Sequence, residues 1–292
     1  MNSEVITIDL AILTSSHTSL VHYQGFLFPS TPLKWDRCVL ILTGTSTKVI
    51  DVRYFIDKFL AQGYAVAAIE RFIGGPLAFL RKRDAERLAT LKHFLDHLYN
   101  DVGIESIDIV AHSYAAQEVV RALDGRPTVL LPRINLISLI NPSGFGNTSG
   151  FLQHCLRFVF LFVVRDYFLH LKRFLEQWRD PPEVKADCRR VMRGIFLLFV
   201  RTILNPGRTF KEVDDIVNCD LRPAVRKLVN EDGRRLQVFL SKGDTLISNQ
   251  RTKDFFLNEL PSVRCIELPG NHLDPLLCQN CVHKVIDALK GQ

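Results

Sequence analysis

Three polar residues whose types could together perform nucleophilic catalysis each follow a short apolar run of this chain. They are Ser113, Asp244 and His272, and the runs before them are Ile107–Ala111, Leu236–Leu240 and Val263–Leu268. A serine hydroxyl is a poor nucleophile until a neighbouring imidazole takes its proton, and a carboxylate fixes the tautomer of that imidazole and stabilises its charged form. Histidine suits the central position because its unperturbed pKa lies near neutrality. This set predicts Ser113 as nucleophile, His272 as general base and Asp244 as the acid that orients it.

The segment around Ser113 reads Ala111-His112-Ser113-Tyr114-Ala115. It ends a predicted buried strand and opens a predicted helix. A serine at so sharp a strand-to-helix turn sits in a strained backbone conformation with its hydroxyl exposed, and the turn needs small residues two positions before and after it. Alanine fills both positions here. The alternative interpretation is that Ser113 is only the N-cap of the helix.

Strand-like and helix-like runs alternate along most of the chain. Strands are expected at Val5–Leu13, Ser19–Phe28, Cys38–Leu42, Tyr64–Ile69, Ile107–Ala111, Ile134–Ile140, Leu236–Leu240 and Val263–Leu268. Helical spacing between them is expected at Val49–Ala61, Arg83–Tyr99, Ser113–Leu123 and Pro275–Leu289. This alternation predicts an α/β fold with a mostly parallel central sheet and helices on both faces. The carboxyl ends of parallel strands share one edge, where sites form.

The segment 146–229 breaks this alternation. Phe151–Trp178 and Lys185–Leu204 are long helical stretches with no strand between them, and residues 151–230 hold nine of the 20 phenylalanines. We therefore expect one domain with a core made of residues 1–145 and 230–292 and a helical cap, 146–229, inserted in it. An apolar inner face of the cap would receive an apolar acyl or alcohol portion of a small-molecule substrate.

The turn around Ser113 resembles the nucleophile elbow of α/β hydrolases, and the order serine, acid, histidine is the order of that family. The resemblance covers roughly residues 5–145 and 230–290. It implies hydrolysis of an ester or thioester through an acyl-enzyme on Ser113, with no cofactor and no metal. It also implies an oxyanion hole formed by the backbone N–H groups of Tyr114 and Thr45. In some members the acid follows the earlier strand, where this chain has Asn141.

Several alternatives stay open at this stage. The same triad serves acyltransferases, lyases and cyclases, and the fold also occurs in ligand-binding, receptor-like proteins with little turnover. Asp244 could merely cap a turn, and His272 could be an ordinary loop histidine.

The net charge of +6 is concentrated in the predicted cap. Residues 151–230 hold 15 Lys and Arg against nine Asp and Glu, and the remainder holds 22 of each kind. Arg157, Arg165, Lys172, Glu176 and Arg179 share one side of the first cap helix. We expect no nucleic-acid binding, because no such motif accompanies this stripe. A solvated face and weak contact with an anionic membrane surface remain the two interpretations.

Cysteine usage and the termini bear on the compartment. Seven cysteines in a long chain suit a reducing environment better than a disulfide framework. Cys278 and Cys281 form a single CxxC inside a predicted helix, which does not favour a zinc or redox site. The segment Met1–Leu10 lacks the basic region of a secretory signal, and the longest apolar runs have seven residues. These features predict a cytoplasmic protein, or one peripheral to a membrane.

Overall fold

A mixed eight-stranded sheet forms the centre of the computed structural model, which describes residues 5–13, 20–29, 37–44, 47–70, 84–124, 133–145, 150–176 and 182–291. The strands are β1 (Ile6–Leu13), β2 (Leu20–Phe28), β3 (Arg37–Leu42), β4 (Ala65–Glu70), β5 (Ser106–His112), β6 (Ile134–Ile140), β7 (Leu236–Ser241) and β8 (Arg264–Leu268). Their order across the sheet is β1-β2-β4-β3-β5-β6-β7-β8. All pairs from β4 to β8 are parallel. The predicted mostly parallel sheet is therefore confirmed.

The amino-terminal strands form the antiparallel edge of the sheet. β1 and β2 pair as a hairpin, with Leu13 opposite Leu20, and β2 pairs antiparallel with β4. The turn expected within residues 15–18 lies outside the described residues.

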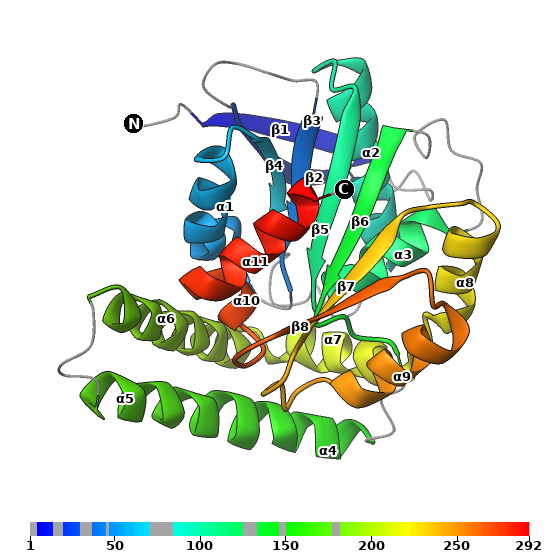
Figure 1. Ribbon diagram of the computed structural model, residues 1–292. Coiled ribbons are helices and arrows are strands. Elements are labelled where there is room, and N and C mark those ends of the chain that lie inside the picture. Colours follow the sequence, from blue (N-terminus) through cyan, green and yellow to red (C-terminus); the bar gives the residue numbers. More distant parts are fainter. Residues whose placement is uncertain are drawn as a thin grey trace.

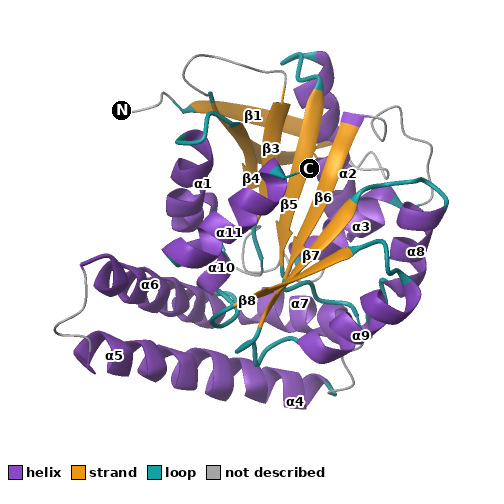
Figure 2. Ribbon diagram, viewed as in Figure 1, coloured by secondary structure: helices purple, strands orange, loops and turns teal. Residues whose placement is uncertain are grey.

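Two layers of helices cover the sheet (Figures 1 and 2). On one face, α2 (Asp84–Asn100), α3 (Ala115–Leu123), α8 (Arg222–Asn230) and α9 (Asn249–Glu259) share a core with strand residues such as Leu40. On the other face, α1 (Arg53–Leu60), α10 (Asp274–Leu277) and α11 (Gln279–Lys290) share a core with strand residues such as Ile41. Neighbouring residues of one strand point to opposite faces, so the continuous apolar runs reflect a sheet buried on both sides.

The cap is helical, as predicted, and lies across the carboxyl ends of β5 and β6 (Figure 1). It contains α4 (Phe151–Leu156), a π-helical segment (Arg157–Arg165), α5 (Asp166–Glu176), α6 (Pro182–Leu204) and α7 (Pro206–Asn218). The first three form the single long helical stretch that the sequence predicts from Phe151, and Trp178 lies outside the described residues. The π segment widens the turn in the middle of this stretch.

Polar contacts fasten the cap to the core at several points. The phenol of Tyr114 donates to Asp215 Oδ2 of α7 at 2.8 Å. Arg201 of α6 forms a bidentate ion pair with Asp51, which lies in the 3₁₀ turn Val49–Val52 before α1. The backbone N–H of Gln279 donates to Asp187 Oδ2 of α6 at 3.0 Å. The cap and the core are thus joined directly beside the sheet edge that carries the candidate site.

The division into a core (1–145, 230–292) and a cap (146–229) stays a prediction. One observation bears on its second boundary. Helix α8, at the end of the predicted cap segment, contacts α3 and contributes Val225 and Leu228 to the core on that face of the sheet. This packing favours a cap that ends with α7.

The predicted carboxyl-terminal helix, Pro275–Leu289, is wrong in one respect. The structure breaks it into α10 and α11 at Cys278, whose backbone is extended at φ −98° and ψ 131°. Cys278 therefore lies at the junction of two helices and not inside one.

Candidate active site

Ser113 occupies a strained turn between β5 and α3. Its φ is +56°, in the left-handed region that a residue with a side chain rarely adopts. Its backbone N–H donates to the carbonyl oxygen of Ile140 at 2.8 Å, which ties the turn to the end of β6. Ala111 and Ala115 are fully buried on either side. The turn thus has the conformation expected of a nucleophile elbow.

Asp244 lies just past the end of β7, and its side chain is buried. Its Oδ1 accepts hydrogen bonds from the backbone N–H groups of Leu246 at 2.8 Å and Ile247 at 3.1 Å. These two bonds leave Oδ2 directed at the imidazole of His272, 2.6 Å from Nδ1. The two hydrogen bonds thus fix the orientation of the carboxylate.

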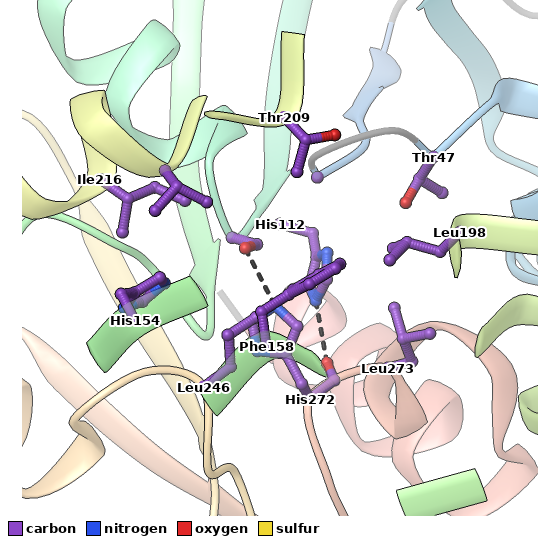
Figure 3. A pocket seen from close by; sticks show the side chains of 13 residues that line it. Thr47, His112, His154, Phe158, Leu198, Thr209, Ile216, Leu246, His272 and Leu273 are labelled. Carbon is purple, nitrogen blue, oxygen red and sulfur yellow. Dashed lines mark hydrogen bonds between the residues drawn. The ribbon is translucent and has the colours of Figure 1, made fainter. Parts of the chain in front are cut away.

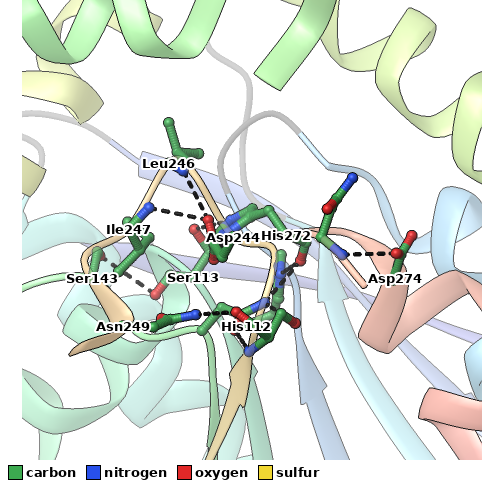
Figure 4. Close-up of polar contacts among 12 residues, drawn as sticks. His112, Ser113, Ser143, Asp244, Leu246, Ile247, Asn249, His272 and Asp274 are labelled. Atoms are coloured by element: carbon green, nitrogen blue, oxygen red, sulfur yellow. Dashed lines mark hydrogen bonds and ion pairs between the residues drawn. The ribbon is translucent and has the colours of Figure 1, made fainter. Parts of the chain in front are cut away.

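His272 lies in the loop after β8 and joins the two other residues (Figure 4). Its Nε2 is 2.9 Å from Ser113 Oγ, and its Nδ1 is 2.6 Å from Asp244 Oδ2. With the Nδ1 proton donated to the carboxylate, the Nε2 lone pair faces the serine hydroxyl. The structure therefore brings together the three residues singled out from the sequence, in hydrogen-bonding order.

A second set of side chains holds the backbone of His272. Nε2 of His112 lies 2.9 Å from the His272 carbonyl oxygen, and Asn141 Nδ2 donates to the same oxygen at 3.1 Å. Asn141 also exchanges hydrogen bonds with Ser241, at 2.9 Å and 2.7 Å. These contacts of Asn141 reach Ser241 and the backbone of His272 and not the imidazole ring. Asn141 therefore supports the loop that carries His272.

The loop that carries His272 depends on Gly270. This residue has a φ of +91°, and a Cβ placed on it would lie 2.1 Å from Asp274 Oδ2. That carboxylate accepts the backbone N–H of Asn271 at 2.7 Å. Only glycine fits a turn that is both left-handed and so crowded.

Of the two residues predicted to form the oxyanion hole, the structure describes only Tyr114. Thr45 lies outside the described residues. Tyr114 follows Ser113 with helical dihedrals at the start of α3, φ −58° and ψ −29°. Gly44, just before Thr45, approaches the turn closely, since a Cβ there would lie 3.0 Å from Ser113 Cβ. The oxyanion role of both residues remains a prediction.

A small cavity opens onto Ser113 and His272 beneath the cap (Figure 3). The cap contributes His154, Phe158, Leu198, Thr209, Val213 and Ile216, and the core contributes Gly44, Thr47, His112, Leu246 and Leu273. Its volume is about 20 Å³, room for roughly one water molecule. A larger substrate therefore requires cap side chains to move.

His154 is a cavity residue that the sequence analysis missed. It is 1 % exposed and lies one helical turn before Phe158 in the first cap helix. Burial, the Arg157 charge and the His272 imidazole lower its pKa to about 4. The sequence offers only its place in the cap as a signal.

The cap's phenylalanines do not all contribute to its inner face. Phe158 is buried against the core, whereas Phe160 and Phe168 are each 59 % exposed. Among the other cap side chains that the structure describes, Phe151, Phe196 and Phe210 are exposed as well. The wider π turn changes the helical period between Arg157 and Arg165, so a face assigned at the α-helical period does not hold there.

Cys278 and Cys281 are buried or half-buried thiols that support the loop. The Cys281 thiol donates to the carbonyl oxygen of Pro269 at 3.2 Å, and burial raises its pKa to about 12. Burial also raises the pKa of Cys278. Both thiols are therefore protonated at neutral pH, when they are poor metal ligands and poor nucleophiles. Among the described residues, no group of three or more His, Cys, Asp or Glu side chains is arranged to hold a metal ion.

The chain has the α/β-hydrolase fold. No protein-family model and no curated protein matches its sequence. Among solved structures, a carboxylesterase of the thaumarchaeon Nitrososphaera gargenis is 15% identical, with a TM-score of 0.62 over 97% of each chain. A peroxisomal alpha-beta-hydrolase of Saccharomyces cerevisiae is 13% identical, with a TM-score of 0.62 over 100% of this chain and 91% of that one. A bromoperoxidase of Bacillus anthracis is 14% identical, with a TM-score of 0.61 over 96% and 100%.

These similarities establish the fold and leave the reaction to the site. In the part of the chain that the structure describes, no helix is both long and apolar enough to span a bilayer.

Proposed function

We propose that this protein is a serine hydrolase that cleaves an ester or thioester with an apolar portion through an acyl-enzyme on Ser113. The observation that carries the proposal is the continuous chain of contacts from Ser113 Oγ to His272 Nε2, 2.9 Å, and from His272 Nδ1 to Asp244 Oδ2, 2.6 Å. Three side chains from three different loops meet in the order that serine activation requires.

The proposed reaction has two stages. Ser113 Oγ attacks the substrate carbonyl carbon while its proton passes to His272 Nε2, and the Asp244 carboxylate stabilises the imidazolium that forms. The oxyanion takes hydrogen bonds from the backbone N–H groups of Tyr114 and Thr45. Collapse of the intermediate releases the alcohol or thiol, which takes the proton from His272. Water, deprotonated by His272, then attacks the acyl-enzyme and frees the acid and Ser113.

The lining of the cavity supports an apolar substrate. Phe158, Leu198, Ile216, Leu246 and Leu273 surround the candidate catalytic residues. Each buried CH₂ of a ligand contributes about 0.8 kcal/mol, so a fitting apolar chain would also help to displace the cap side chains that fill the site.

Acyl transfer to an acceptor other than water is the second candidate. It would pass through the same acyl-enzyme on Ser113, and the acceptor that reaches the acyl group decides between the two reactions. Lyase and cyclase chemistry would use the same three residues. A receptor-like protein with little turnover has less support, since ligand binding alone does not require the Ser113–His272 contact.

We also propose that the cap contacts anionic membrane surfaces. Large apolar side chains recur every four residues along the outer cap helix and are solvent-exposed: Leu156, Phe160, Val164 and Phe168. The exposed Arg165, Lys172 and Arg173 lie on the same helix. Exposed aromatic residues combined with basic ones are typical of helices that lie in a lipid interface.

Turnover of p-nitrophenyl esters tests the proposed function. The wild-type protein should release p-nitrophenol from acetyl to octanoyl esters, and Ser113→Ala should lower kcat by about 10⁴-fold or more, because the nucleophile, base and acid act as a unit. Adding a primary alcohol or thiol distinguishes the two candidates, since an acyltransferase would divert the acyl group to it. A folded Ser113→Ala variant with wild-type turnover would refute the role of Ser113.

A further inference from the structure

We infer that His154 recognises the substrate, by a hydrogen bond to an uncharged hydroxyl or carbonyl group that is separate from the bond cleaved. The inference deepens the proposed function and rests on it. It defines the substrate as an ester or thioester whose apolar chain carries one oxygen substituent.

The position of His154 is the first support. The residue belongs to the short helix α4 of the cap, and its side chain lines the same cavity as Ser113 and His272 (Figure 3). It is 1 % exposed, so the cavity is where a partner for its imidazole would arrive. Phe158, one turn further on, also lines the cavity.

The hydrogen bonding of His154 is the second support. Its buried Nδ1 has no hydrogen-bond partner within the described residues. Buried polar groups are almost always paired, because an unpaired one forfeits its hydrogen bonds to water. The unpaired Nδ1 of His154 lies in the same cavity as the candidate nucleophile. We therefore expect it to form its hydrogen bond with a bound ligand.

The charge state of His154 limits what it binds. Its pKa of about 4, lowered by burial, by Arg157 and by His272, leaves the ring neutral at physiological pH. A neutral imidazole offers one N–H donor and one acceptor nitrogen. Hydroxyl and carbonyl groups match these without bringing a second charge into a buried site.

The surroundings of His154 define the rest of the substrate. Phe158, Ile216 and Leu246 present only carbon atoms to the cavity, and the hydroxyl of Thr209 already donates to the Asn205 carbonyl oxygen at 3.4 Å. Near His154 a ligand thus meets a mainly apolar wall, while the other polar side chains of the lining, Thr47, His112, Ser113 and His272, belong to the core. Sites built in this way reject analogues that lack the matching polar group.

A matched ester panel tests the inference. Plain p-nitrophenyl octanoate and hexyl butyrate are compared with analogues in which one oxo group is moved along the acyl or the alcohol chain. We expect wild-type kcat/KM to favour at least one oxo analogue by about 10-fold, the usual worth of one buried hydrogen bond. His154→Leu should abolish that preference, and His154→Gln, which keeps a donor and an acceptor, should restore part of it.

Phe158→Leu is the matched control in the same cavity. It removes apolar contact without touching the hydrogen bond, so it should change kcat/KM for the plain and oxo esters by similar factors. Equal kcat/KM for plain and oxo esters at every position, or a preference that survives in His154→Leu, would overturn the inference. Either result would show that His154 does not select the substrate.

A binding measurement separates failure of this inference from failure of the proposed function. Ser113→Ala protein is titrated with the preferred oxo ester and its plain analogue, and the ¹⁵N resonances of the histidine rings are followed. A shift of the His154 ring resonances with the oxo ester alone supports recognition, even if the wild-type protein proves to have no turnover. Turnover at Ser113 with no such shift would retain the proposed function and refute the role of His154.

Discussion

His112 and His272 lie 160 residues apart in sequence, yet Nε2 of His112 is 2.9 Å from the carbonyl oxygen of His272. The residue directly before the candidate nucleophile therefore holds the backbone of the candidate base. Asn141 donates to the same oxygen from the end of β6. The turn at Ser113, the end of β6 and the His272 loop form one hydrogen-bonded unit, which fixes the imidazole relative to the serine hydroxyl.

Replacing His112 should impair catalysis through this positioning role. We expect His112→Ala to lower kcat by about 10- to 100-fold with little change in KM, because misplacement of a catalytic group affects the transition state more than binding. His112→Gln, whose amide can donate to the His272 carbonyl, should recover part of the loss. Steady-state kinetics on a p-nitrophenyl ester measure both. Unchanged kcat in a folded His112→Ala protein would contradict the role.

Asp244 and Asn141 should differ sharply when substituted. Asp244→Asn removes the charge that stabilises the imidazolium and should lower kcat by about 10⁴-fold, as loss of the acid does in other triads. Asn141→Ala breaks buried hydrogen bonds to the backbone and should mainly reduce stability, by about 1–3 kcal/mol. Kinetics and urea unfolding of both variants give the comparison. The opposite ranking in activity, with both variants folded, would refute the assignment of the acid.

Asp166, at the cap's buried face, should make stability depend on pH. Its side chain is 1 % exposed, and burial, opposed by Arg165, raises its pKa to about 6 from an ordinary value of 3.8. The folded state therefore binds a proton at Asp166 more tightly than the unfolded state does. The contribution of this carboxyl group to the free energy of unfolding is fully present below pH 4 and is lost as the pH rises through 6.

The variant Asp166→Asn should not lose stability in this way, because an asparagine side chain does not titrate. Its free energy of unfolding relative to wild type should rise between pH 4 and pH 7, by up to roughly 3 kcal/mol at 1.36 kcal/mol per pKa unit. Urea unfolding of both proteins at the two pH values measures the change. A difference that stays constant with pH would show that Asp166 titrates alike in the folded and unfolded states.

The exposed cap residues should determine binding to lipid. We expect the protein to co-sediment with vesicles that contain phosphatidylserine, and added salt to weaken this binding because it screens the basic side chains. Phe160→Ser combined with Phe168→Ser should reduce binding by about 10-fold or more. Leu257→Ser on the core helix α9, where Leu257 is 55 % exposed, is the control. Equal binding by all three proteins would leave the outer cap helix as a solvated face.

The sequence predicts the site better than it predicts the surroundings of the site. Ser113, Asp244 and His272 follow strands that run parallel, and parallel strands place their carboxyl ends at one edge, so local pattern suffices to bring them together. His112 could not be assigned in this way, because its partner atom belongs to the backbone of a distant loop. Thr45 and Tyr114 rest on the resemblance alone.

Two features of the helices also lie outside the local sequence pattern. The break at Cys278 occurs where Asp187 of the cap accepts the first N–H of α11, a capping interaction that no local sequence contains. The π segment from Arg157 to Arg165 alters the helical period, so an α-helical projection does not predict which apolar side chains of this stretch, such as the buried Phe158 and the exposed Phe160, face the core. His154 shares this cap, where the sequence carries no family pattern.

Covalent labelling at Ser113 tests the central claim most directly. A small dialkyl fluorophosphate should form one adduct, in which Ser113 Oγ bonds to phosphorus and fluoride leaves, and peptide mapping by mass spectrometry locates it. The account predicts labelling at Ser113 in the wild-type protein and labelling slowed by about 100-fold or more in His272→Ala, because the imidazole activates the hydroxyl. Folded wild-type protein that remains unlabelled, or that is labelled at another residue, would contradict it.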